Sequence, residues 1–189
     1  ETCYINGPVA KVIGGGQKAI NFNSEYNQQF FFPVGKGSYA PIWVGVTTPE
    51  GSFGSPGTNL KVEAFDTNSG TASANIAYLS QNRWEVSKIA GTIIDFNIKV
   101  GDSEIKENNI LVQAPAANGM YDNDFGITAT FVEGEPNTLA SNTAPLPFSN
   151  FEGYFSTARQ SECSVVTPGN TIASKTTICN GVPITLSLE

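Results

Sequence analysis

The sequence predicts an all-β protein, built as a sandwich or barrel of short strands. Charged residues make up only 14% of the 189 residues, while Gly, Ser, Thr, Asn and aromatic residues are plentiful, a composition that suits strands and turns better than helices. Several segments alternate between apolar and polar residues with the period of a strand, and clusters of turn-forming residues separate them. A chain of this length can bury one core, so we expect residues 1–189 to form a single domain.

The expected strands share this period of two, and they are residues 19–23, 43–46, 60–65, 93–100, 110–113, 127–132 and 184–188. The turns expected between them are rich in Gly, Pro, Asn and Ser, and they are residues 34–37, 51–57, 67–70 and 115–119. Only residues 72–87 also allow a short helix, although Tyr78 and Trp84 suit a strand equally well.

Residues 133–161 differ from the rest of the chain. Three prolines, at 136, 145 and 147, interrupt the segment, and proline denies a sheet the backbone donor that a central strand requires. We therefore expect a long loop with an edge segment. Its aromatic residues either complete the core as a lid or form an exposed contact surface, and they are Phe148, Phe151, Tyr154 and Phe155.

The charge and the residue types exclude several classes of function. A formal net charge of −7 with ten Lys and Arg residues argues against nucleic acid and anionic membranes as partners, and no apolar run is long enough to span a bilayer. The chain has no histidine, the commonest general base and a preferred zinc ligand. We therefore expect a binding protein with no catalytic residues, metal or cofactor.

The three cysteines indicate an oxidising compartment. Cys163 and Cys179 flank a turn-rich segment around residues 168–170, so a disulfide between them would close a hairpin-like loop. The chain-entropy model gives such a loop about 3 kcal/mol of stabilisation. The odd count leaves the third cysteine, Cys3, without an assigned partner.

The first residues carry a family resemblance. Cys3 is followed by the run Ile13-Gly14-Gly15-Gly16 and then by the alternating residues 20–23. This order resembles the start of the receptor-binding domains of chaperone-usher pilus tip adhesins, including the mannose-binding adhesins of type 1 fimbriae. The family pairs its first cysteine with one about forty residues later, which has no counterpart here. Cys3 is then either free or bonded to Cys163 or Cys179, with the Cys163–Cys179 pair as the leading option.

A second segment carries the same resemblance. A strand at 110–113 ends in Gln113, Asn118 follows, and Tyr121 precedes an Asp-Asn-Asp-Phe stretch at 122–125. In the family, the corresponding residues line a sugar pocket. Carboxylates and amides bind vicinal hydroxyls, and aromatic rings cover the apolar face of a sugar.

The resemblance implies an elongated immunoglobulin-like or jelly-roll β-sandwich with a ligand pocket at one end. Gln113, Asn118 and Asp124 would hydrogen-bond the ligand, with Asp122 beside them. Ile13 and Tyr121 would form an apolar rim, Phe125 would support the floor, and the α-amino group of Glu1 would donate to the ligand. Read without the resemblance, Asp122 and Asn123 simply make a turn and Phe125 packs in the core.

The function that the resemblance implies is attachment of a bacterium to a host glycan or glycoprotein, from the tip of a pilus on the cell surface. It also implies a C-terminal pilin domain beyond this chain, through which a periplasmic chaperone and the next pilus subunit would bind. Two alternatives remain open. One is a structural pilus or surface subunit without a ligand, and the other is an adhesin that binds a host matrix protein through the aromatic loop.

Overall fold

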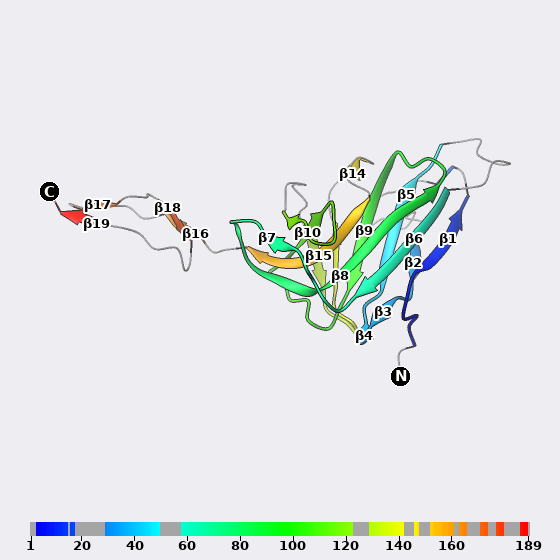
Figure 1. Cartoon of the computed structure of the whole chain (residues 1–189), viewed down its shortest axis with the longest axis horizontal. Helices are drawn as coiled ribbons and strands as arrows, with labels where there is room; N and C mark the ends of the chain where they lie inside the picture. Colours follow the sequence, from blue (N-terminus) through cyan, green and yellow to red (C-terminus); the bar gives the residue numbers. More distant parts are fainter. Residues whose placement is uncertain are drawn as a thin grey trace.

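The protein is all-β, and most of its longer strands form two antiparallel sheets packed face to face (Figure 1). The structure, a computed structural model, describes residues 3–14, 16–17, 29–49, 58–122, 129–141 and 152–160. It also describes the backbone of 146–147, 163–165, 171–173, 177–179 and 186–188. No helix occurs within these ranges. The predicted all-β class and the sandwich are therefore confirmed.

The first sheet has five strands in the order β1-β6-β8-β15-β10, and every pairing in it is antiparallel. Their bounds are β1 Val9–Ile13, β6 Thr58–Phe65, β8 Ile76–Ala90, β15 Gly153–Gln160 and β10 Asn109–Ala114. Strand β6 shows why one face is apolar, because Leu60, Val62 and Ala64 are buried while the residues between them are half-buried. Successive side chains of a strand point to opposite faces, so this alternation turns the apolar set toward the core.

The second sheet has six strands in the order β12-β13-β9-β5-β2, with β14 also paired to β9. Their bounds are β2 Gln29–Phe32, β5 Ile42–Thr47, β9 Asp95–Gly101, β12 Ala129–Val132, β13 Thr138–Ser141 and β14 Leu146–Pro147. Strands β5 and β9 pair with Val44 opposite Ile98. Both residues are fully buried, and they contribute to the core between the sheets.

Directional contacts cross the core between the two sheets. The indole Nε1 of Trp84 on β8 donates a buried hydrogen bond of 2.8 Å to the carbonyl oxygen of Ala40, which precedes β5. Phe155 of the first sheet meets Phe96 of the second edge to face, with ring centroids 6.1 Å apart. These contacts complement the apolar packing by fixing how one sheet sits on the other.

A smaller apolar cluster lies on the other face of the five-stranded sheet. On β10, Leu111 belongs to the main core, whereas its neighbour Val112 belongs to this second cluster together with Ala158 and Tyr121. The two strands beside it are β7 Thr71–Ala72 and β11 Met120–Tyr121, which pair in parallel. Both faces of the first sheet are therefore partly covered.

The remaining strands form small ladders of their own. Strands β3 Gly35–Lys36 and β4 Ser38–Tyr39 pair around Gly37, which has a φ of 67° that favours glycine. Strand β16 Cys163–Val165 pairs with β18 Thr177–Cys179, and β17 Thr171–Ala173 pairs with β19 Leu186–Leu188. Figure 1 draws these last four strands to one side of the sandwich.

The expected strands at 43–46, 60–65 and 110–113 are confirmed as β5, β6 and β10. The segment 93–100 corresponds to β9, which begins two residues later and extends to Gly101. Residues 72–87, which also allowed a helix, contain most of the 15-residue strand β8. The expected strand at 19–23 lies outside the described residues.

The prediction of a long loop at 133–161 is wrong. Strand β13 is paired on both sides in the second sheet, and β15 lies between β8 and β10 in the first. The prolines of this region do not interrupt either strand, because positions 136 and 145 precede them and 147 ends the short β14. Phe155 is fully buried, as a residue that completes the core would be, and it is not part of an exposed surface.

We predict that Trp84→Phe lowers the free energy of unfolding by about 2 to 3 kcal/mol, because it leaves a small cavity and removes the donor to the buried Ala40 carbonyl. Urea unfolding followed by circular dichroism measures this change. The matched control is Trp43→Phe, since Trp43 is only half-buried against Phe31. It should cost less than about 1 kcal/mol, and an equal cost for both variants would contradict the role given to Trp84.

We also predict a disulfide between Cys163 and Cys179. These residues are directly opposite each other in the β16–β18 ladder, and cross-strand partners have Cα atoms about 4.5 to 5.5 Å apart, within the range for a disulfide. Cys3 is exposed and free. Mass spectrometry of an unreduced digest should show the two peptides linked, with Cys3 alone alkylated. A linked peptide that contains Cys3 would contradict this pairing.

Candidate functional site

Four of the predicted ligand residues lie around the turn between β10 and β11: Gln113, Asn118, Tyr121 and Asp122. Gln113 and Asp122 form an antiparallel bridge with two backbone hydrogen bonds of 3.1 Å. The structure therefore brings these four residues into one region at the edge of the five-stranded sheet.

The polar side chains of this region mostly bind other parts of the protein. Gln113 is buried, and its Nε2 donates to the Glu152 carbonyl oxygen at 3.2 Å. Oδ1 of Asp122 accepts a hydrogen bond of 3.1 Å from Oγ of Ser73. Asn118 is exposed. Two of the three polar candidates thus help to hold neighbouring segments together.

The prediction that Tyr121 forms an apolar rim is wrong, because its side chain is fully buried. Gly70 packs so closely against it that a Cβ at position 70 would meet the Tyr121 ring and lie 2.6 Å from the Gly119 carbonyl oxygen. Burial raises the pKa of the Tyr121 phenol to about 12, although the nearby Arg83 acts in the opposite direction. Tyr121 is therefore a core residue of the second apolar cluster.

The prediction that Ile13 joins the same rim is also wrong. Ile13 is fully buried in the main core, on the edge strand β1. Gln113 lies on β10, the opposite edge of the five-stranded sheet. Neighbouring strands are about 4.8 Å apart, so the two edges are separated by roughly 19 Å. Gly14 and Gly16 instead contact the residues that follow β5: Thr48 Oγ1 donates to the Gly14 carbonyl oxygen, and the Gly16 N–H donates to the Pro49 carbonyl oxygen.

The other predicted ligand residues, Glu1, Asp124 and Phe125, lie outside the described residues, as do Phe148 and Phe151 of the aromatic segment. A ligand contact through the α-amino group or through Asp124 therefore stays a prediction.

Arg83 organises the face of the first sheet that carries the second apolar cluster. Its guanidinium carbon lies 4.8 Å from the centroid of the Phe65 ring and 5.1 Å from that of Tyr154. Nη1 donates to Ser69 Oγ at 2.9 Å and to the Ala117 carbonyl oxygen at 2.6 Å. This buried cation therefore joins two loops to the sheet through charge-assisted bonds and cation–π contacts.

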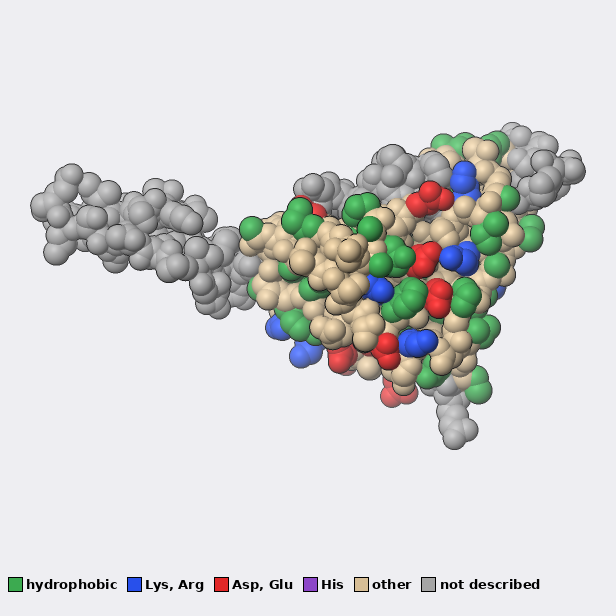
Figure 2. All heavy atoms as spheres, in the orientation of Figure 1, with side chains coloured by type: hydrophobic (Ala, Val, Ile, Leu, Met, Phe, Trp, Pro, Cys, Tyr) green, Lys and Arg blue, Asp and Glu red, His purple; other side chains and the backbone are tan. Residues whose placement is uncertain are grey.

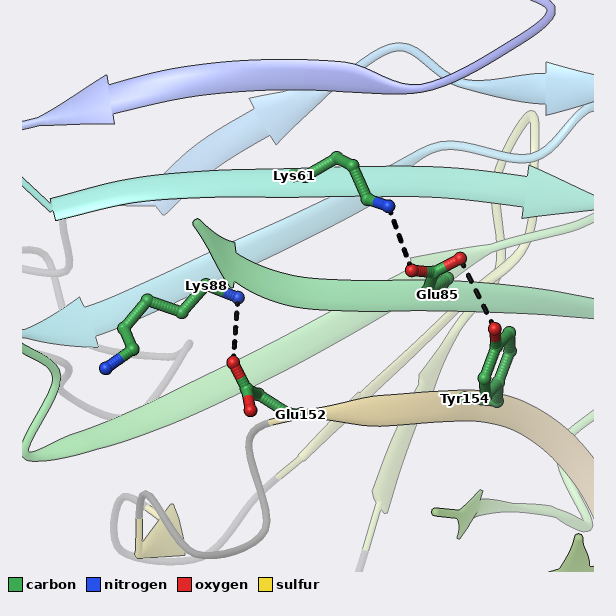
Figure 3. Close-up of polar contacts among 5 residues, drawn as sticks. All are labelled: Lys61, Glu85, Lys88, Glu152 and Tyr154. Carbon is green, nitrogen blue, oxygen red and sulfur yellow. Dashed lines mark hydrogen bonds and ion pairs between the residues drawn. The ribbon is translucent and has the colours of Figure 1, made fainter. Parts of the chain in front are cut away.

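Positive, negative and hydrophobic side chains are interspersed on the face of the molecule that Figure 2 shows. The Lys61 amine lies 3.0 Å from Oε1 of Glu85, and the Tyr154 hydroxyl donates to Oε2 of Glu85 at 3.4 Å (Figure 3). The hydrogen bond to Glu85 raises the pKa of Lys61. Because both partners of the ion pair are partly exposed, it contributes only about 0 to 1 kcal/mol. Lys61, Glu85 and Tyr154 therefore bind one another, which leaves these three residues poorly suited to bind a ligand.

A cleft of about 420 Å³ lies at one end of the sheet, beside the loop that joins β9 to β10. We call it the Tyr78 cleft, and its lining residues are Tyr78, Ser103, Glu104, Lys106, Asn109 and Arg159. Asn109, Arg159 and Tyr78 form a row of direct cross-strand partners on β10, β15 and β8. Such partners have neighbouring side chains on the same face, which explains why residues distant in the sequence meet here.

The lining of the Tyr78 cleft is mixed in its chemistry. Tyr78 is 39% exposed, and the guanidinium carbon of Arg159 lies 4.8 Å from the centroid of its ring. Ser103, Glu104 and Lys106 are exposed on the loop above it. An aromatic ring beside hydroxyl, carboxylate, ammonium and guanidinium groups suits a polar ligand that also has apolar carbon surface.

Asn109 makes this cleft rigid at its base. Its Nδ2 donates to the Ala158 carbonyl oxygen at 3.3 Å, and its Oδ1 accepts from the Lys106 backbone N–H at 2.7 Å. The loop that carries Lys106 is thereby tied to the strand that carries Arg159.

A second cleft, of about 360 Å³, shares Ser103 with the first. We call it the Tyr39 cleft, and its lining residues are Tyr39, Ser103, Gly134, Glu135, Pro136 and Asn137. Asn137 holds its wall in place, because Nδ2 donates to the Ile105 carbonyl oxygen at 2.9 Å and Oδ1 accepts from the Gly134 N–H at 3.0 Å. The 102–108 loop therefore separates two neighbouring hollows.

Sequence reasoning missed the Tyr78 cleft for a physical reason. Tyr78 lies in the segment that also allowed a helix, and Arg159 lies in the segment expected to be a loop. Their pairing depends on the register of β8 and β15, which shifts between Ser156 and Ala158. A bulge of this kind leaves no local hydrophobic signal from which the pairing could have been read.

Within the described ranges, no three acidic or cysteine side chains gather in a way that could hold a metal ion. The same residues contain no helix that is long and apolar enough to cross a membrane. Comparisons of the chain with protein-family models, with curated proteins and with solved structures found no match.

We predict that Tyr121→Phe reduces the loss of stability at alkaline pH. The pKa of Tyr121 is raised from 10.0 to about 12 in the folded protein, so the unfolded chain releases this proton first. The stability linked to this proton is fully present below about pH 10 and is lost as the pH rises to about 12. Urea unfolding across this range should show a smaller decrease for the variant than for the wild type.

The same variant should cost less than about 1 kcal/mol at pH 7, because the buried Tyr121 hydroxyl makes no well-formed hydrogen bond among the described residues, although Arg83 and Asn68 lie close enough to lower its pKa. Equal alkaline slopes for both proteins, or a large loss at neutral pH, would contradict this description of Tyr121.

Proposed function

We propose that this protein is the receptor-binding domain of a bacterial pilus tip adhesin and that it binds a host glycan or glycoprotein in the Tyr78 cleft. The observation that carries the proposal is the row of Asn109, Arg159 and Tyr78 across three strands, which places an exposed aromatic ring beside several polar groups. Sugars present both hydroxyl groups and apolar C–H faces, so a cleft of this composition suits them. The proposed site differs from the ligand pocket that the family resemblance implied.

Two further observations support the assignment to a pilus and to an extracellular location. The motifs at residues 3–16 and 110–125 resemble those of pilus adhesins. The opposed positions of Cys163 and Cys179 suit a disulfide and therefore an oxidising, extracellular location. In that setting a pilin domain after this chain would bind the chaperone and the other pilus subunits, as the resemblance implies. The proposed activity is binding without catalysis.

A structural pilus or surface subunit is the second candidate. It is favoured by Gln113 and Asp122, whose side chains bind Glu152 and Ser73 within the protein. The third candidate binds a matrix protein through the aromatic segment. Phe155 cannot contribute to such a surface, because it is buried in the core. A binding experiment with the folded domain separates the three candidates. A glycan-binding adhesin binds glycans, a matrix-binding adhesin binds a deglycosylated protein, and a structural subunit binds neither.

We predict that Tyr78→Ala weakens glycan binding at least tenfold. The substitution removes the ring and also the surface against which Arg159 packs. A glycan array identifies the ligand, and titration calorimetry then compares the variants. The matched control is Ile89→Ala, because Ile89 is 56% exposed on the same strand but does not line the cleft.

Ile89→Ala should retain the wild-type affinity within a factor of two. If Tyr78→Ala is folded and binds as tightly as the wild type, the Tyr78 cleft is not the site. If the folded wild type binds no glycan and no glycoprotein, the receptor-binding proposal itself is wrong.

A further inference from the structure

Among the described residues, the two cations of the Tyr78 cleft have no ion-pair partner. No described carboxylate lies within ion-pair distance of Arg159 or Lys106, although Glu104 lines the same cleft. Lys61, by contrast, is paired with Glu85 on the same sheet. The cleft therefore has two exposed positive groups that form no ion pair with a described residue, in a chain whose net charge is −7.

Arg159 is also held in a suitable geometry. Its guanidinium packs on the Tyr78 ring with 4.8 Å between the guanidinium carbon and the ring centroid. A stacked guanidinium keeps its N–H groups available at its edge, where they match the two oxygens of a carboxylate. Because the stack restricts the side chain before a ligand arrives, less conformational entropy is lost on binding.

Lys106 is tied to the same framework. Asn109 accepts from the Lys106 backbone N–H and donates to the carbonyl oxygen of Ala158, the residue before Arg159. The two cations therefore belong to backbone segments that one buried side chain joins. At physiological ionic strength, salt screens the electrostatic effect of acidic residues that lie more than about 8 Å away. The charges of the lining residues therefore dominate inside the cleft.

We propose that the ligand of the Tyr78 cleft is an acidic oligosaccharide whose carboxylate pairs with Arg159, with Lys106 adding a second positive charge. This inference rests on the proposed function and specifies its class of ligand. Ser103 and Glu104, on the same loop, can bind the neighbouring sugar hydroxyls.

The test compares saccharides that differ only in whether the carboxyl group is ionised or esterified: 3′-sialyllactose with its methyl ester, and oligogalacturonate with its methyl ester. The wild type should bind the acidic member of at least one pair tenfold more tightly than the neutral member. Arg159→Gln should reduce the preference for the acidic member over its neutral counterpart at least tenfold. The matched control is Lys36→Gln, which removes an exposed positive charge from β3, outside the cleft.

Equal affinity for the acidic and neutral members, with both weakened by Tyr78→Ala, would overturn the acidic ligand and leave the glycan-binding proposal intact. A preference for the acid that survives both Arg159→Gln and Lys106→Gln would overturn the assignment of the carboxylate to these cations. If the folded wild type binds neither member of either pair nor any glycan of an array, both proposals fall. Circular dichroism and thermal melting verify that each variant is folded.

Discussion

The hydrogen bond from the Trp84 indole to the Ala40 carbonyl is the contact on which the rest of the sandwich depends. Apolar packing pulls the two sheets together, but it has little directional preference. A buried donor with one well-placed acceptor 2.8 Å away adds that direction. One residue earlier on β8, Arg83 points to the opposite face and holds two loops there. A single long strand thereby organises both faces of its sheet.

The position of the Tyr78 cleft follows from the same strand. The first half of β8 carries Tyr78, and the irregular register with β15 places Arg159 directly beside it. The loop from β9 to β10 then closes over this row, anchored by Asn109 and by the carboxylate of Asp102, which accepts from Asn82 at 2.6 Å. The cleft is therefore supported by strands and buried polar contacts, which favour a preformed site over one that must be ordered by its ligand.

The sequence predicted those strands whose apolar and polar residues alternate locally. Alternation identified β5, β6 and β10, because each has an apolar set that faces the core. Strand β15 was missed because the prolines before it indicated a loop, although they lie outside the strand itself. Whether the predicted ligand residues could meet in one pocket depended on which strands are neighbours in the sheet. Ile13 and Gln113 occupy opposite edges of one sheet, and no local pattern in the sequence determines that order.

The contact between Gly70 and Tyr121 also constrains how the sequence can change during evolution. Position 70 has no room for a side chain while an aromatic ring fills position 121, so neither residue can change independently without disturbing the packing. In an evolving lineage, the glycine would be replaced only after or together with a smaller residue at 121. These two positions should therefore covary, and a joint substitution would distinguish relatives that have rebuilt this face of the sheet from those that have kept it.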